Sequence, residues 1–279
     1  MKNWAPSTTS ARPKLRGATI ALISLALALV IASCGPNPKP ETDAISRVGV
    51  VLLSQVGDSA IPTGHGSFAQ LTQERAKELM EQPLGAEVGT CTVMQLGSGV
   101  AGPIVNAPNV GRLSVPDLNL AANGVAYAQL QQAESGSFTL VGATAPLPSS
   151  GLTVSLPASS TFPAFNNMAV ATGEAPILEA GFDPDAIDTT TEFRWVAGES
   201  GAALLLIGSG NDVTFSCIAD DAPGAFSFPE ETRDALTSAG FVTGNLETLG
   251  RLSMSSATDG GSAQLLVGTL RLASLGAIE

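Results

Sequence analysis

Residues 125–156 read Val125-Ala-Tyr-Ala-Gln-Leu130, then Ser137-Phe-Thr-Leu-Val141, then Leu152-Thr-Val-Ser-Leu156. The runs are short, most of them alternate apolar with polar residues, and Gly, Pro or Ser separates them, which is typical of strands with one buried face. Two further runs, at 91–95 and 111–115, have the same character. Together they predict a mostly β fold of short antiparallel strands.

The pattern extends in both directions along the chain. Residues 47–53 predict a first buried strand, and Gly64-His65-Gly66-Ser67 predicts a loop. Residues 72–81 predict a short surface helix, because apolar residues recur there at helical spacing and Pro83 follows. In the second half, strands are expected at 168–171, 190–196, 202–207, 213–219, 249–253 and 263–273.

A second short helix is expected after Phe226-Ser-Phe-Pro229. Proline suits a first helical position, Glu230 and Glu231 favour the positive end of the helix dipole, and Gly240 can end the helix. Residues 157–166, with two prolines, are the best candidate for a domain boundary. We therefore expect two antiparallel β-sandwich-like modules, at 46–160 and 161–279, or one continuous sandwich, with two short surface helices.

The N-terminus has the three parts of a secretory signal peptide over residues 1–33. A region with four basic residues and no acid precedes an apolar run, which ends in Leu29-Val-Ile-Ala-Ser33 before Cys34. An uncleaved transmembrane helix is the alternative, but the run is slightly short for a span, and Gly35-Pro36-Asn37-Pro38 lacks a basic flank.

Small residues directly before Cys34 resemble the lipobox of bacterial lipoproteins, and this resemblance covers residues 1–35. It implies cleavage before Cys34, a diacylglycerol on the Cys34 thiol, and often a further acyl chain such as palmitate on the freed amine. Gly35 in place of Asp implies the outer membrane where the host has two membranes. The Pro-rich segment 34–45 is then an extended tether that lifts the body off the membrane.

Two cysteines, Cys91 and Cys217, remain once Cys34 carries lipid. In an exported protein the simplest expectation is one disulfide between them, and two separately buried thiols are the alternative. Removal of the signal peptide leaves nine Lys and Arg against 25 Asp and Glu, a formal charge of −16. This charge argues against nucleic acid as a partner.

The motifs that carry chemistry are few. His65, the only histidine, lies between glycines, and Ser67 is too close in sequence for a triad partner. Residues 97–102 match G-x-G-x-x-G, but Pro103 follows where a dinucleotide site needs a helix, so no nucleotide is expected. Gly-Arg-Leu-Ser occurs at 111–114 and again at 250–253, which is weak evidence for a duplication.

Acidic residues supply the remaining candidates. Calcium is the one candidate cofactor, and its candidate ligands are Asp183, Asp185 and Asp188. A second acidic cluster is Asp220-Asp221. A solvated acidic turn is the alternative for both. Paired carboxylates could serve a hydrolase, whereas Trp195 is expected in the core.

No catalytic constellation emerges from these motifs. The expected function is therefore a non-enzymatic binding or structural subunit, lipid-anchored to the cell envelope, that meets another envelope protein or a surface polymer. The alternative is an exported carboxylate-dependent hydrolase, which calcium could assist.

Overall fold

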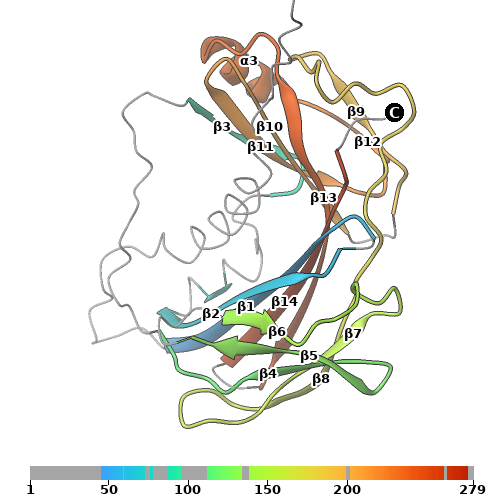
Figure 1. Ribbon diagram of the computed structural model, residues 1–279. Coiled ribbons are helices and arrows are strands. Elements are labelled where there is room, and N and C mark those ends of the chain that lie inside the picture. Colours follow the sequence, from blue (N-terminus) through green and yellow to red (C-terminus); the bar gives the residue numbers. More distant parts are fainter. Residues whose placement is uncertain are drawn as a thin grey trace, which may run out of the picture.

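The computed structural model describes residues 45–58, 60–72, 76–77, 87–95, 112–133, 138–198, 202–260 and 263–275. Within these ranges the protein is mostly β, as predicted, with three sheets and one full helix (Figure 1). No helix in these ranges has the length and apolar character needed to span a membrane. The predicted signal peptide, Cys34 and residues 97–102 lie outside them. Of the predicted 72–81 helix, Thr72 is not helical but ends a strand, Ala76 and Lys77 are helical, and the other residues lie outside the described ranges.

A curled seven-stranded sheet forms the backbone of the structure, in the order β2-β1-β14-β13-β10-β11-β3. Its strands are β1 (Ile45–Val56), β2 (Thr63–Thr72), β3 (Thr90–Gln95), β10 (Ala203–Gly210), β11 (Val213–Asp220), β13 (Asn245–Thr258) and β14 (Ala263–Leu272). All neighbours are antiparallel except β1 and β14, which pair in parallel. Strands from both sides of residue 160 therefore share this sheet.

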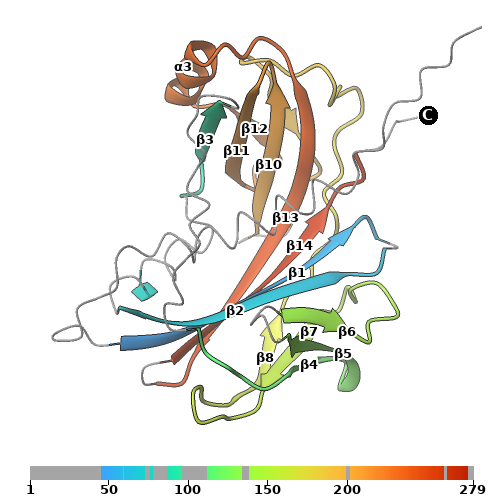
Figure 2. The ribbon, with the colours of Figure 1, turned by 60° about the vertical axis from the view of Figure 1, so that its left-hand side comes forward.

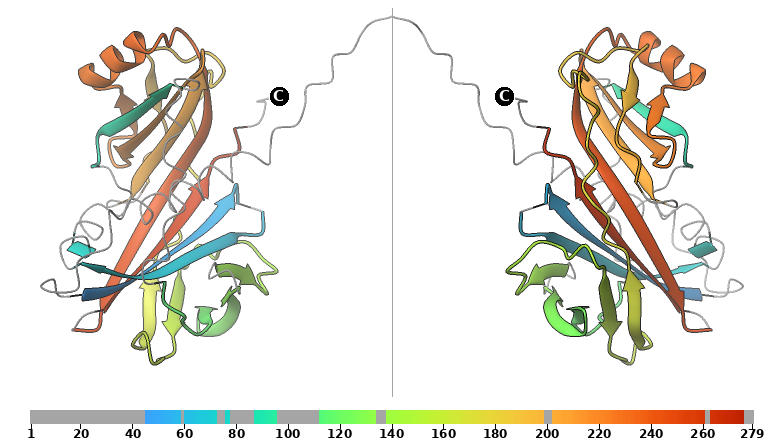
Figure 3. Two further views of the ribbon diagram at one scale, coloured as in Figure 1. Left: turned by 90° about the vertical axis from the view of Figure 1, so that its left-hand side faces the viewer. Right: turned by 90° about the vertical axis from the view of Figure 1, so that its right-hand side faces the viewer.

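Two smaller sheets pack against the long one at its two ends (Figures 1 and 2). The five-stranded sheet has the order β6-β5-β4-β7-β8, formed by β4 (Leu118–Ala122), β5 (Val125–Gln132), β6 (Phe138–Val141), β7 (Leu152–Leu156) and β8 (Phe165–Val170). The two-stranded sheet pairs β9 (Glu192–Arg194) with β12 (Ala225–Ser227) and is followed by helix α3 (Glu230–Ser238). Figure 3 shows the long sheet running between these two parts.

Each end of the long sheet has its own apolar core. At the lower end, β1 and β14 pack against the five-stranded sheet through buried residues that include Leu53, Phe68, Leu118, Phe138 and Leu265. At the upper end, β10, β11 and β13 pack against β9 and α3 through Phe193, Trp195, Leu206, Phe215 and Leu236. The opposite face of the long sheet is also apolar and buried, with Val50, Leu52, Leu252, Leu266 and Leu270.

Two local predictions need correction. Residues 64–67 are not a loop but part of β2, where Gly64 pairs with Leu53 and His65 with Leu52. A Cβ on Gly64 would lie 3.0 Å from Leu53 Cδ2 and 3.1 Å from Leu140 Cβ, so this glycine permits close packing of the two sheets. Residues 112–115 do not form a regular strand, and only Arg112 makes an isolated bridge, to Ala69.

The helix after Pro229 is confirmed. Pro229 is the N-cap residue, one position earlier than expected, and the helix begins at Glu230. Gly240 follows the helix with φ +87°, a left-handed conformation that glycine adopts at no steric cost, as its predicted role requires.

Candidate functional site

The two apolar cores are separated by a band of polar side chains on the same face of the long sheet. We call Gln55, Thr269, Arg271 and Arg251 the polar belt: Gln55, Arg271 and Arg251 are register partners on β1, β14 and β13, and Thr269 lies two residues before Arg271 on the same face of β14. Arg251 lies directly opposite Arg271, and both are buried. Like charges in such a pair destabilise a sheet unless each has its own partner.

Beside the polar belt lies a cleft of about 870 Å³, at the junction between the five-stranded sheet and the upper part of the molecule. We call it the junction cleft. Its walls are residues 149–153, 169–175 and 196–198, together with Ile177, and Arg251 and Ser253 of β13 also line it.

Arg251 ties together the segments around the junction cleft. Its Nη1 donates to the carbonyl of Glu174 (3.0 Å) and its Nη2 to the carbonyl of Val196 (2.8 Å). Each carbonyl belongs to a different wall, so one guanidinium holds both walls against β13. These two hydrogen bonds fix the positions of the two walls relative to each other.

Asp221 balances the charge of Arg251. Arg251 Nε and Nη2 donate to the two carboxylate oxygens at 2.6 and 3.1 Å, and the Asp221 side chain is fully buried. Trp195 Nε1 donates to Asp221 Oδ1 at 2.9 Å and so fixes the carboxylate from the core side. A buried ion pair needs such additional hydrogen bonds to offset the desolvation of both charges.

Gly198 leaves room for this pair. A Cβ at Gly198 would lie 2.1 Å from Asp221 Oδ2 and 2.5 Å from Arg251 Nε, so no other residue fits without displacing them. Trp195, Gly198, Asp221 and Arg251 therefore act as one unit, which we call the buckle.

Arg271 has a different environment, away from the lining of the junction cleft. It donates to Asp58 (2.6 Å), to the carbonyl of Leu147 (3.3 Å) and to Gln55 Oε1 (3.4 Å). Burial raises the pKa of the nearby Tyr127 hydroxyl, and the positive charge of Arg271 partly opposes that shift. These contacts fasten the loop after β6 to the polar belt.

The candidate calcium ligands cap turns on the upper part of the molecule. Asp183 Oδ1 accepts from the backbone N–H of Asp185, and Asp188 Oδ1 accepts from Thr190 N and Oγ1 at 2.8 Å each. The hydrogen bonds from Thr190 hold the pKa of Asp188 below its usual range. Within the described ranges no three acidic, histidine or cysteine side chains gather into a metal site, and the calcium site stays an untested prediction.

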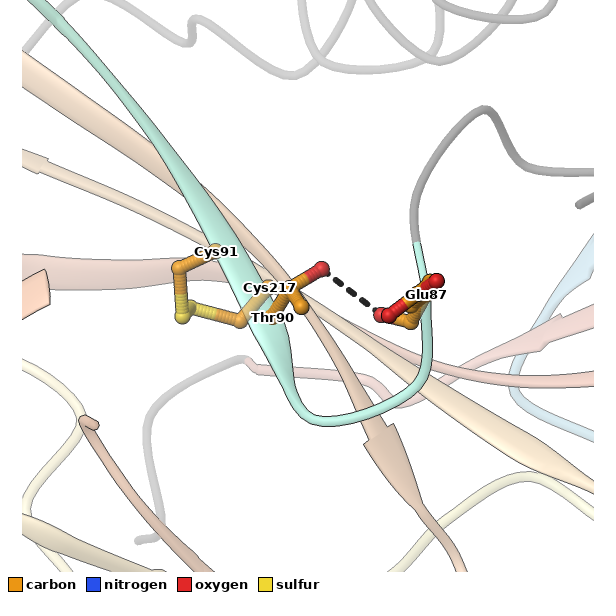
Figure 4. Close-up of a disulfide and its surroundings, with 4 residues drawn as sticks. All are labelled: Glu87, Thr90, Cys91 and Cys217. Atoms are coloured by element: carbon orange, nitrogen blue, oxygen red, sulfur yellow. Dashed lines mark hydrogen bonds between the residues drawn. A yellow bond between two sulfur atoms is a disulfide. The ribbon is translucent and has the colours of Figure 1, made fainter. Parts of the chain in front are cut away.

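The predicted disulfide is confirmed (Figure 4). Cys91 on β3 and Cys217 on β11 are register partners with a Cα–Cα distance of 4.0 Å, which places them side by side on adjacent strands. Thr90, the residue before Cys91, donates through Oγ1 to the carbonyl of Glu87 in the turn that leads into β3 (Figure 4). The disulfide therefore fastens the edge strand β3 to the upper part of the long sheet.

The remaining candidates lie apart from the junction cleft. His65 is exposed on β2, and Asp220 caps the backbone N–H of Ala222. Glu174 is the one acid among the described residues that line the cleft, whereas a carboxylate hydrolase needs two facing acids. Trp195 is buried, as predicted. Nothing in the sequence links Trp195 to Asp221, which are 26 residues apart, or Asp221 to Arg251, which are 30 residues apart.

Comparison with known proteins places the chain in no family. No protein-family model, curated protein or solved structure matches it.

Proposed function

We propose that the protein is a non-enzymatic binding lipoprotein of the bacterial cell envelope, anchored through Cys34, and that the junction cleft is its binding site. The observation that carries the binding proposal is the buckle. A buried ion pair orients Arg251, and two further hydrogen bonds from Arg251 hold the walls of a cleft of about 870 Å³ in place. Preformed concave sites of this size are typical of ligand binding.

The anchor proposal rests on the sequence of residues 1–35, with support from the disulfide. A basic region, an apolar run and Ile31-Ala-Ser-Cys34 form the lipoprotein pattern. Disulfides such as Cys91–Cys217 persist in proteins outside the reducing cytosol. The Pro-rich tether would hold the acidic body away from an anionic membrane surface.

Anchoring is tested by replacing Cys34 with Ala in the full-length chain. The variant should lose metabolic labelling with a palmitate analogue and leave the membrane fraction, while Asn37→Ala in the tether should keep both. Unchanged membrane retention of Cys34→Ala would contradict the anchor.

Binding at the cleft is tested by photo-crosslinking in cells. A photoreactive residue at Ile177, which is 64% exposed at the cleft, should give a discrete crosslinked product. Val242 is a matched control, since it is 68% exposed on the upper part of the molecule and does not line the cleft. The same products from both positions, or none from Ile177, would contradict a binding role for the cleft.

A further inference from the structure

One wall of the junction cleft is a backbone segment with unused hydrogen-bonding groups. Residues 171–177 connect β8 to the isolated bridge between Leu178 and Trp195, and they belong to no strand. Among the described residues, no acceptor meets the backbone N–H groups of Gly173, Glu174 or Ala175. Backbone groups at such a position are satisfied by water or by a ligand.

The side chains around this segment are small. Gly173, Ala175, Ala197 and Gly198 line the cleft, and Arg251 holds the carbonyls of Glu174 and Val196 from the β13 side. Small side chains let a second backbone approach closely. Gly173 has a left-handed conformation (φ +46°), so this segment is not a strand edge, but its N–H groups can donate to carbonyl oxygens of a peptide main chain.

The charge of the lining favours a cationic ligand. Glu174 is exposed, and the positive charge of Arg251 is already balanced by Asp221 at 2.6 Å. The lining therefore carries one unbalanced negative charge, on a chain with a formal charge of −12. Complementary charge steers a basic partner to such a surface and disfavours an acidic one.

An apolar contact is available at the same place. Ile177 and Val196 line the cleft, are 64% and 56% exposed, and are joined by a hydrogen bond from Val196 N to the Ile177 carbonyl (2.8 Å). Two adjacent exposed aliphatic side chains form a surface on which an apolar side chain of a ligand can pack.

We propose that the junction cleft binds a basic peptide segment of a partner protein, in an extended conformation. Its backbone carbonyls accept from N–H groups of residues 173–175, a Lys or Arg approaches Glu174, and an aliphatic side chain packs on Ile177 and Val196. This inference deepens the proposed function and rests on it.

The test uses the full-length protein in mild detergent and a phage-displayed library of random dodecapeptides. The library should yield binders rich in Lys, Arg and β-branched residues. Ala175→Trp fills the cleft and should lower their enrichment at least tenfold, while Ala180→Trp, exposed outside the cleft, should keep it. Urea unfolding of both variants checks that each is folded.

Further variants leave the interior untouched and keep the test valid if Ala175→Trp fails to fold. Ile177→Lys should repel the selected peptides. Glu174→Lys should lower the affinity for the selected peptides by about twofold to fivefold, as expected for an exposed ion pair. Glu179→Lys, outside the lining, should leave this affinity unchanged. Synthetic copies that carry thioamides at alternate residues present sulfur, a weaker acceptor than the amide oxygen, and should lose about twofold to tenfold in affinity in one of the two registers.

The outcomes separate this inference from the proposed function. Acidic binders, equal enrichment on wild type, Ala175→Trp and Ile177→Lys, or no effect of thioamide substitution would overturn the peptide proposal. If no peptide is enriched while Ile177 still crosslinks to a partner, the peptide proposal fails and the binding function stands. If Ile177 gives no crosslink either, both fail.

Discussion

Replacing Arg251 with Met should lower the free energy of unfolding by about 3–5 kcal/mol, because it leaves the Asp221 carboxylate buried without a cation. The structure gives the reason for the size. Asp221 is fully buried and would lose two charge-assisted hydrogen bonds, keeping only the Trp195 indole as a side-chain donor. The carbonyls of Glu174 and Val196 would also lose their donor.

The double variant Arg251→Met, Asp221→Asn separates charge pairing from packing. Asn at 221 can still accept from Trp195, and neither variant residue is charged. The sum of the losses in unfolding free energy for Arg251→Met and Asp221→Asn alone should therefore exceed the loss for the double variant by at least about 1 kcal/mol, as found for residues in contact. Urea unfolding followed by tryptophan fluorescence measures all three, because Trp195 is buried beside Asp221. Losses that add to within about 0.5 kcal/mol would refute the reasoning.

Two other predictions follow from contacts on the upper part of the molecule. The Cys91→Ala, Cys217→Ala variant should lose up to about 5 kcal/mol in urea unfolding, since the bond closes a loop with a sequence separation of 126 residues; an unchanged urea midpoint would contradict a stabilising role. Asp188→Asn should cost less than about 1 kcal/mol at neutral pH, because solvent screens the charge of this partly exposed carboxylate and the Asn oxygen can still accept from Thr190. The pKa of Asp188 is lowered in the folded state, so the stability from its carboxylate is present above the unfolded pKa and is lost as the pH falls through the folded pKa. Wild type and variant should therefore converge as the pH falls below the ordinary carboxyl pKa of 3.8. A difference that persists at lower pH in thermal unfolding would exclude this explanation.

The sequence predicts the elements whose signals are local. Most of the expected strands are present, because alternation along one strand reports its own burial, and Pro229 and Gly240 mark the helix ends they were expected to mark. The pairing of Cys91 with Cys217 follows from cysteine count and compartment.

The features missed depend on contacts between distant segments. Gly64 and Gly66 suggest a turn, yet they lie in β2, where a Cβ on Gly66 would meet Phe138 at 3.2 Å. Glycine within a strand often marks the close approach of another segment, but Thr63, His65 and Ser67 provide no apolar run that would indicate a strand here. Arg251 stood out only as part of a repeated tetrapeptide, and nothing near it in sequence indicates Asp221 or the walls of the junction cleft.

The parallel pairing of β1 with β14 has a consequence for how the chain folds. Arg47 lies beside Ala263 and Val56 beside Leu272, so two interior neighbours of the long sheet are the earliest described strand and the latest. Contacts of such large sequence separation slow folding, because closing a long loop costs chain entropy before the contacts can form. A ribosome must therefore release residues up to 272 before the lower core can close. For a protein that we propose to be exported, this delay would keep the lower core open, and that part of the chain competent for translocation, until β14 has been made.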